Sequence, residues 1–240
     1  MQIRAVLDPR QRNSDKHMKN QQSGNAMIYI LIALALLGAL TMVLARGGSE
    51  GGSDLTADQA ELMTTRMTAT SGVAKNAVDQ MMMSGTSVSS LNFVTPNVAS
   101  YDTAPHYNKV FHPDGGGLSL EKDAKLFTGT DTTPVPGWYM GRFNNIEWTP
   151  TAANDVVLAA HDISQAVCAN INKKITGDGA IPVLLGTGDP ATYFVNTSFG
   201  GPANANLTTA ICAACEGHPA LCVSNTGATQ FTYYSIISGQ

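Results

Sequence analysis

Residues Ala26 to Ala45 read AMIYILIALALLGALTMVLA. No charged side chain occurs between Asn20 and Ala45, and the apolar run matches the ~20 residues that a helix needs to cross the hydrocarbon core of a bilayer. A helix satisfies its own backbone hydrogen bonds, so such a segment can lie in lipid at low cost. We therefore predict a transmembrane helix over residues 25–46.

Basic side chains dominate the segment that precedes this helix. Residues 1–24 contain the basic Arg4, Arg10, Arg12, Lys16 and Lys19 and the acidic Asp8 and Asp15. Because basic flanks stay on the cytoplasmic side of a membrane, residues 1–24 are expected to form a cytoplasmic leader, and the chain after Gly47 is expected to be exported. The expected location is the bacterial inner membrane, with one span and a periplasmic or extracellular carboxyl-terminal part.

The junction between leader and span carries a resemblance. A basic leader that ends in Ser23-Gly24, followed by an uninterrupted apolar helix that begins Ala26-Met27-Ile28, resembles the type IV pilins and the pseudopilins of type II secretion. In that family a prepilin peptidase cleaves after the glycine, and the apolar helix then packs in the core of a filament. The resemblance implies cleavage between Gly24 and Asn25.

Two positions depart from the pattern of that family. The first mature residue is usually Phe or Met and the fifth is usually Glu, whereas this chain has Asn25 and Tyr29. The family's glutamate neutralises the amino terminus of a neighbouring subunit. Its absence implies a minor subunit that assembles through Met27, Ile28 and Tyr29 with other pilin or pseudopilin subunits and with inner-membrane lipid. The alternative is an uncleaved, single-pass, membrane-anchored periplasmic binding protein.

The exported part is acidic and large enough for one core. From Gly47 onward it has 8 basic and 16 acidic side chains, a net charge of −8. Nucleic-acid binding depends on cations that neutralise phosphates, so this composition excludes nucleic acid as a partner. About 190 residues are enough for one sizeable domain rather than two.

Four cysteines lie in the exported part, at Cys168, Cys212, Cys215 and Cys222. An even number in an oxidising compartment predicts two disulfides. One bridge should tie Cys168 to the carboxyl-terminal segment and close a loop of 44 to 54 residues. Of the three connectivities, all of which stay open, we slightly prefer Cys168 bonded to Cys212 or Cys215. A zinc site that includes His218 is the alternative, but its ligand spacing is tight and it leaves Cys168 unpaired.

A glycine-rich joint over residues 47–55 separates the span from a second helix. Thr56 and Gln59 have the spacing of a capping box, which predicts an amphipathic helix over residues 56–84. Apolar side chains at helical spacing should pack against the domain. They are Met63, Met67, Ala74, Val78 and Met81.

The globular domain is expected over residues 85–240. Its first part, to Pro136, is rich in loops, with short strand candidates at 109–112 and 117–120. The patterns then predict strands at 138–143, 146–149, 155–160, 181–185, 192–195 and 230–237, and helices at 163–175 and 205–215. The first two of these strands should form a hairpin around Asn144-Asn145. The expected fold is thus α+β: a transmembrane helix and an amphipathic helix that carry an antiparallel sheet domain with two further short helices and two disulfides.

No motif predicts catalysis or a cofactor. His161, Asp162 and Ser164 are residue types of a hydrolase triad, but triad members come from separate elements and the chain has no nucleophile elbow. We expect His161 to lie at a strand end on the surface. Asp114 and Asp178 lie in glycine-rich loops, where one carboxylate each falls short of the six to eight oxygens that calcium binds. The sequence therefore predicts a protein that is not an enzyme and that holds no metal or cofactor.

Overall fold

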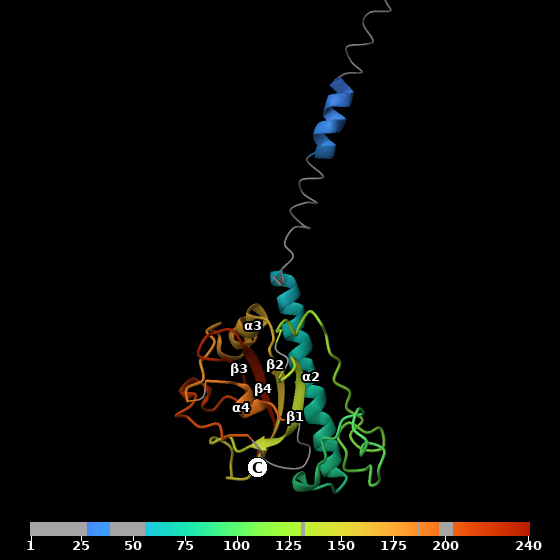
Figure 1. Cartoon of the computed structure of the whole chain (residues 1–240), viewed down its shortest axis with the longest axis vertical. Helices are drawn as coiled ribbons and strands as arrows, with labels where there is room; N and C mark the ends of the chain where they lie inside the picture. Colours follow the sequence, from blue (N-terminus) through green and yellow to red (C-terminus); the bar gives the residue numbers. More distant parts are fainter. Residues whose placement is uncertain (1–27, 39–55, 131–132, 187, 197–203) are drawn as a thin grey trace, which may run out of the picture. The chain divides into compact units, whose positions relative to one another are not determined.

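The computed structural model in Figure 1 describes residues 28–38, 56–130, 133–186, 188–196 and 204–240. The chain divides into two compact units, Met1–Gly52 and Ser53–Gln240. In the first unit, residues 28–38 form a helix in which every residue is exposed. None of the helices in the described parts of the chain is both long and apolar enough to cross a membrane. The expected leader, half of the expected span (residues 25–27 and 39–46) and the joint lie outside the described residues.

The second unit begins with a long capped helix, α2 (Ala57–Met83). The Thr56 side chain accepts a hydrogen bond from the Gln59 backbone N–H, and the Gln59 side chain accepts one from the Thr56 N–H, each at 3.3 Å. The predicted capping box is therefore confirmed. All five apolar residues of the predicted stripe are buried, at exposures of 5% or less.

A four-stranded antiparallel sheet forms the centre of this unit, with the strand order β1-β2-β4-β3. The strands are β1 (Gly137–Asn144), β2 (Asp155–His161), β3 (Ala220–Ser224) and β4 (Phe231–Ser238). The two inner strands are β2, in which all seven residues are buried, and β4, the predicted closing strand. The α+β class and the antiparallel sheet are thus confirmed.

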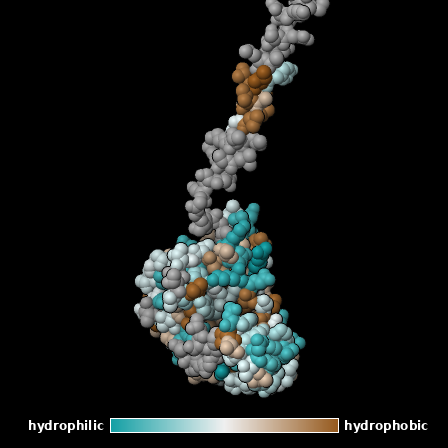
Figure 2. All heavy atoms as spheres, turned by 45° about the vertical axis from the view of Figure 1, so that its right-hand side comes forward, coloured by the Kyte–Doolittle hydropathy of each residue, from teal (hydrophilic) through white to brown (hydrophobic). Residues whose placement is uncertain are grey.

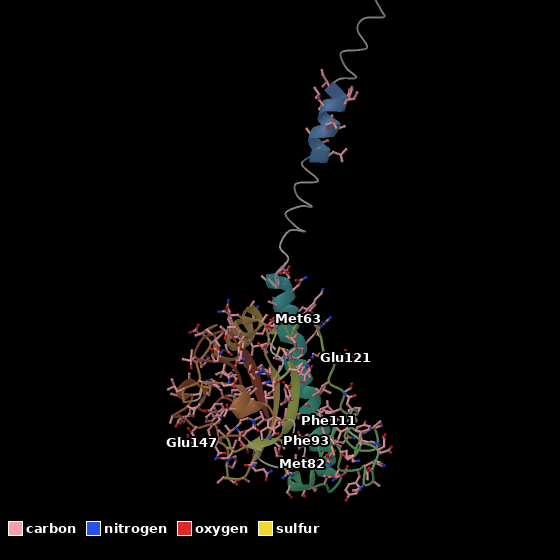
Figure 3. All side chains as sticks on the ribbon, in the orientation of Figure 1. Met63, Met82, Phe93, Phe111, Glu121 and Glu147 are labelled. Carbon is pink, nitrogen blue, oxygen red and sulfur yellow. A yellow bond between two sulfur atoms is a disulfide. The ribbon has the colours of Figure 1, made fainter. Side chains whose placement is uncertain are left out.

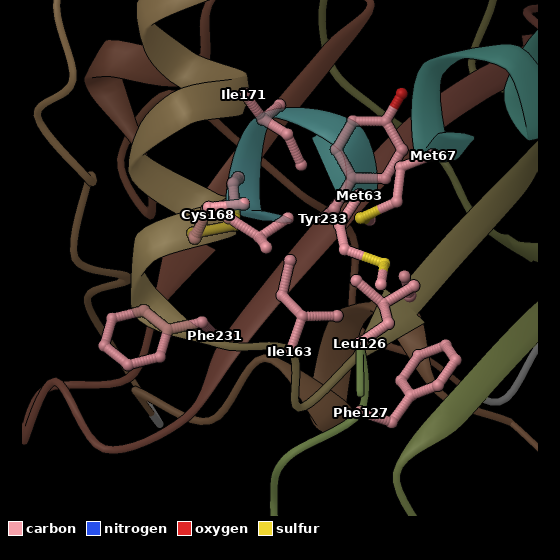
Figure 4. Packing of buried hydrophobic residues seen from close by; sticks show 13 residues of the cluster. Met63, Met67, Leu126, Phe127, Ile163, Cys168, Ile171, Phe231 and Tyr233 are labelled. Carbon is pink, nitrogen blue, oxygen red and sulfur yellow. A yellow bond between two sulfur atoms is a disulfide. The ribbon is translucent and has the colours of Figure 1, made fainter. Parts of the chain in front are cut away.

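The two long helices of this unit cover one face of the sheet. On that face α2 and α3 (Gln165–Thr176) contribute Met63, Met67, Cys168 and Ile171 to a cluster that includes Tyr233 of β4. Figure 4 shows these side chains converging between the two helices and the sheet. Further along α2, a second cluster joins the helix to β1 and β2.

The opposite face is covered by α4 (Ala191–Phe194) and by the chain that surrounds the short 3-10 helix η3 (Ala213–Cys215). There Phe194 stacks on Tyr234 with ring centroids 5.0 Å apart. The connection from α2 to β1 contains another short 3-10 helix, η2 (Val88–Ser90), but neither of the strand candidates at 109–112 and 117–120.

Helix α3 follows its sequence signals closely. Ser164 caps its start by accepting the Val167 N–H at 3.4 Å, and Gly177 ends it with a φ of +82°. This left-handed backbone is what favours glycine after a helix. The helix begins two residues later than the predicted Ile163, because the Ile163 N–H bonds to the carbonyl of Phe231 at 3.0 Å.

The predicted hairpin around Asn144-Asn145 is wrong. Strand β1 pairs with β2, and residues 146–149 form part of the loop between them. The buried Asp155 holds this loop, since its Oδ2 accepts the Ile146 N–H at 2.8 Å and the Thr149 hydroxyl at 3.0 Å. The Asp155 carboxylate, nine residues after Ile146, thus takes the backbone N–H that the expected hairpin would have paired with another strand.

The carboxyl-terminal third differs most from the predictions. Residues 191–194 form the helix α4 instead of a strand, and 205–215 form turns with η3 instead of a helix. Residues 181–185 make one isolated bridge, between Val183 and Ser224, and β3 was not predicted. The Cys212–Cys215 disulfide and the backbone bond from Glu147 N–H to Leu207 carbonyl, at 3.0 Å, hold 205–215 in its irregular path.

Candidate functional site

The residues expected to act in processing and assembly lie in the first unit. Gly24, Asn25 and Met27 are outside the described residues. Ile28 and Tyr29 begin the helix of residues 28–38, and their exposed fractions are 55% and 71%. In Figure 2 this helix is mostly brown, the colour of hydrophobic residues, with a pale-teal group on one side.

The four cysteines form two disulfides, Cys168–Cys222 and Cys212–Cys215. The pairing of Cys168 with Cys212 or Cys215 was therefore a wrong preference, whereas the prediction of one long loop is confirmed at a separation of 54 residues. The pairing follows from the position of α3, which lies against β3 and so presents Cys168 to Cys222. The zinc alternative fails because each of the four sulfur atoms belongs to a disulfide, so none is a free thiolate. Within the described ranges, no three side chains of metal-binding type come together.

The three triad-type residues serve the fold instead. Ser164 is the cap of α3, and His161 Nδ1 lies 3.0 Å from the hydroxyl of Thr232. The expectation that His161 is a surface residue is wrong, because its side chain is fully buried at the end of β2. Asp162 is buried as well and has a φ of +62°.

A groove of about 900 Å³ lies beside β1. One wall comes from β1 and the residues just before it, and the other from the connection between α2 and β1. Its apolar lining consists of Phe93, Pro96, Phe111, Pro113, Leu118, Leu120, Val135, Pro136, Trp138 and Met140. Figure 3 labels Phe93 and Phe111 of this lining, which project from the connection near the lower part of β1. A groove of this volume lies within the range of ligand sites.

Hydrogen bonds to main-chain carbonyls fix three aromatic side chains of the groove. Trp138 Nε1 donates to the Glu121 carbonyl at 3.1 Å, and the Tyr139 hydroxyl donates to the Val135 carbonyl at 2.6 Å. The Tyr101 hydroxyl donates to the Phe111 carbonyl at 2.9 Å. Burial raises the pKa of the Tyr139 phenol. Among the described residues that line the groove, the few remaining polar side chains include one lysine, Lys122.

The outer wall of the groove is built around a buried lysine. Lys109 is 3% exposed, and its ammonium group donates to the carbonyls of Ser100, Tyr101 and Thr103. Three acceptors match the three donors of an ammonium group. Gly116 closes the turn beneath it, where an added Cβ would lie 2.5 Å from the Val110 carbonyl oxygen. Lys109 therefore holds the loop in place rather than offering a charge to a ligand.

The two edges of the sheet differ. At β3, the Asn172 side chain bonds to both the N–H and the carbonyl of Cys222, and Ser224 bonds to the backbone of Pro182 and Leu184. At β1, the main-chain groups on the side away from β2 have no hydrogen-bond partner within the described residues. The groove adjoins this unpaired edge.

Comparisons of the chain with protein-family models, with curated proteins and with solved structures found no match. The sequence does not predict the groove, because residues 85–136 have the composition of a loop-rich segment. The signal that could have indicated it is the presence of Phe93, Tyr101 and Phe111 in a segment that otherwise has the composition of a loop.

Proposed function

We propose that this protein is a minor pilin-like or pseudopilin subunit of a type IV pilus or type II secretion apparatus. Its amino-terminal helix mediates assembly after removal of the leader by a prepilin peptidase. The acidic domain is displayed on the periplasmic or extracellular side of the bacterial inner membrane. The protein is not an enzyme and acts through its contacts with other subunits and with lipid.

The observation that carries this proposal is the helix of residues 28–38. All of its side chains from Ile28 to Leu37 lack a charge, and every residue from 28 to 38 is exposed in this chain. Leu34 and Leu36, for example, are 60% and 66% exposed. A helix that is hydrophobic all round is stable only when lipid or other helices surround it. In the proposed assembly, lipid and neighbouring subunits cover this helix.

The architecture of the second unit is consistent with this role. A long capped helix packs on one face of an antiparallel sheet, and a long connection joins the two. This is the order of elements that the resemblance to pilins implies. Two disulfides fasten the carboxyl-terminal part, as is suited to an exported domain.

Assembly by lateral packing of the apolar helix gives a direct experiment. A photo-reactive benzoyl-phenylalanine replaces Leu34, and cells that express the full chain are irradiated. We expect cross-linked products in which mass spectrometry identifies a second chain with a basic leader and an apolar helix. The matched control carries the same group at Leu185, which is also 60% exposed but lies in the second unit.

Two results would contradict the proposal. The first is a Leu34 derivative that forms no cross-link to protein although it is present in the membrane. The second is a cross-linking pattern that does not change when Gly24→Leu blocks leader removal. Either result favours the alternative, an uncleaved anchor that carries a periplasmic binding domain.

A further inference from the structure

We propose that the outer edge of β1 and the groove beside it bind an extended polypeptide segment of a partner protein. The bound segment adds to the sheet as a strand next to β1. This proposal is independent of leader cleavage, because it concerns only the second unit.

The unpaired edge indicates what kind of molecule binds. A strand presents alternating N–H and C=O groups along its edge, and another extended main chain matches both. Proteins commonly protect such edges against pairing. Here the β3 edge is protected by Asn172 and by residues 182–184, while the β1 edge is open in the described structure. The difference indicates that the β1 edge is kept free for a partner.

The length of the open edge sets the length of the bound partner segment, here called the guest. Pro136 lies immediately before β1 and cannot donate a ladder hydrogen bond. A bulge between Arg142 and Asn144 ends the regular pairing at the other end. Residues 137–142 therefore form the usable edge, and a guest strand of about six residues matches it.

The groove supplies the side-chain specificity. Alternate side chains of a strand point to the same face, so every second residue of the guest would enter the groove. Phe93, Leu118 and Leu120 line it, which favours apolar guest residues at those positions. Lys122 is the groove's lysine in a domain that carries twice as many acidic as basic side chains, which favours a carboxylate at one end of the guest.

A second copy of this chain does not supply a suitable guest through its own β1. Trp138 and Met140 of β1 already pack in the cluster formed with Val78 and Met81 of α2. They are therefore not free to fill the groove of another molecule. The guest is accordingly a segment with unengaged apolar side chains, which belongs to a different protein.

The test uses the full chain in detergent and a phage-displayed library of random nine-residue peptides. Selected sequences are synthesised, and their binding is measured from the fluorescence of Trp138 in a Trp148→Phe background, which leaves one tryptophan. We expect enrichment of alternating apolar residues. Val135→Asp, at a groove residue that is 50% exposed, should weaken binding at least tenfold. The control Leu185→Asp changes a side chain that is 60% exposed outside the groove and should leave binding unchanged.

Peptide N-methylation tests the main-chain pairing itself. Alternate residues of an added strand direct their N–H groups toward β1, and the residues between them direct theirs away. Methylation of the nitrogens in the first register, which face β1, should abolish binding. Methylation in the second register, which faces away, should not. Equal effects of the two registers would overturn strand addition. Equal binding to Val135→Asp and Leu185→Asp would overturn the groove as the site. If the chain forms dimers and the peptides only dissociate them, the β1 edge is occupied by a second copy of the chain. That result would overturn the choice of a different protein as the guest.

Discussion

The side-chain amide of Asn172 replaces a neighbouring strand for Cys222. Its Oδ1 accepts the Cys222 N–H and its Nδ2 donates to the Cys222 carbonyl, both at 2.8 Å. The same nitrogen donates to the Ala180 carbonyl at 2.8 Å. Because Asn172 and Cys222 are fully buried, no water can replace the hydrogen bonds between them. The amide therefore closes the β3 edge, at the strand to which the Cys168–Cys222 disulfide also joins α3.

Loss of this amide should be costly. Asn172→Ala leaves the N–H and the carbonyl of Cys222 buried without partners, and we expect the free energy of unfolding to fall by about 2–4 kcal/mol. Denaturant unfolding of the full chain in detergent measures this change. Asn170→Ala, at a half-buried position of the same helix, is the control and should cost clearly less. Equal effects of the two substitutions would show that the amide does not stabilise the edge.

The two disulfides should contribute unequally. In the chain-entropy model, the loop closed over 54 residues by Cys168–Cys222 is worth roughly 4 kcal/mol, and the loop closed over 3 residues by Cys212–Cys215 roughly 2 kcal/mol. The paired alanine substitutions Cys168→Ala/Cys222→Ala and Cys212→Ala/Cys215→Ala can be compared by thermal unfolding. We expect the first pair to lower the melting temperature more. The reverse order would contradict the assigned roles.

Tyr29 offers a test of subunit rarity. If the missing fifth-position carboxylate keeps this chain a minor subunit, Tyr29→Glu should increase the amount recovered in sheared filaments. Tyr29→Phe removes the hydroxyl without adding a carboxylate, so it should leave that amount unchanged. Immunoblots of sheared fractions, normalised to total protein in the cells, provide the measurement. An unchanged yield of the glutamate variant would attribute the rarity to expression level.

Glu147 should titrate below its ordinary range. Its carboxylate accepts the Thr209 backbone N–H at 2.6 Å and the Thr209 hydroxyl at 3.0 Å, and these bonds lower the pKa of Glu147 from its ordinary value of 4.5. The contribution of Glu147 to stability is thus fully present above pH 4.5 and is lost as the pH falls through the lower folded-state pKa.

Thr209→Val tests the hydroxyl share of this shift. It removes the hydroxyl and keeps the backbone N–H, so the pKa of Glu147 should rise part of the way back. An NMR titration of the Glu147 carboxyl group measures this pKa, with Thr208→Val as the control. A pKa that responds equally to both substitutions, or that lies above 4.5 in the unmodified chain, would refute the assignment.

The sequence predicted those elements whose signals are local. The capping box of Thr56 and Gln59, the stripe that includes Met67, and the Ser164 and Gly177 ends of α3 depend on residues a few positions apart. The predictions failed where a distant partner decides the conformation. Ile146 has a strand-like pattern, but Asp155 takes its N–H, and nothing in the short β3 indicated that Asn172 would close its edge.

The candidate sites divide in the same way. The exposed apolar helix that contains Ile28 and Tyr29 follows from composition alone. The groove depends on Phe93 and Trp138 meeting across 45 residues of chain and on the anchoring of the loop by Lys109. Such a meeting is a property of the folded chain, and the local sequence gives no more sign of it than the aromatic residues of the connection, Phe93, Tyr101 and Phe111.

The amino terminus of the protein recovered from cells tests the central claim most directly. Mass spectrometry is applied to the chain from cells with and without an active prepilin peptidase, and to the Gly24→Leu variant. The proposed function predicts a mature chain that starts at Asn25 only when the peptidase is active and Gly24 is present. An intact leader that begins at Met1 in cells with an active peptidase would contradict it.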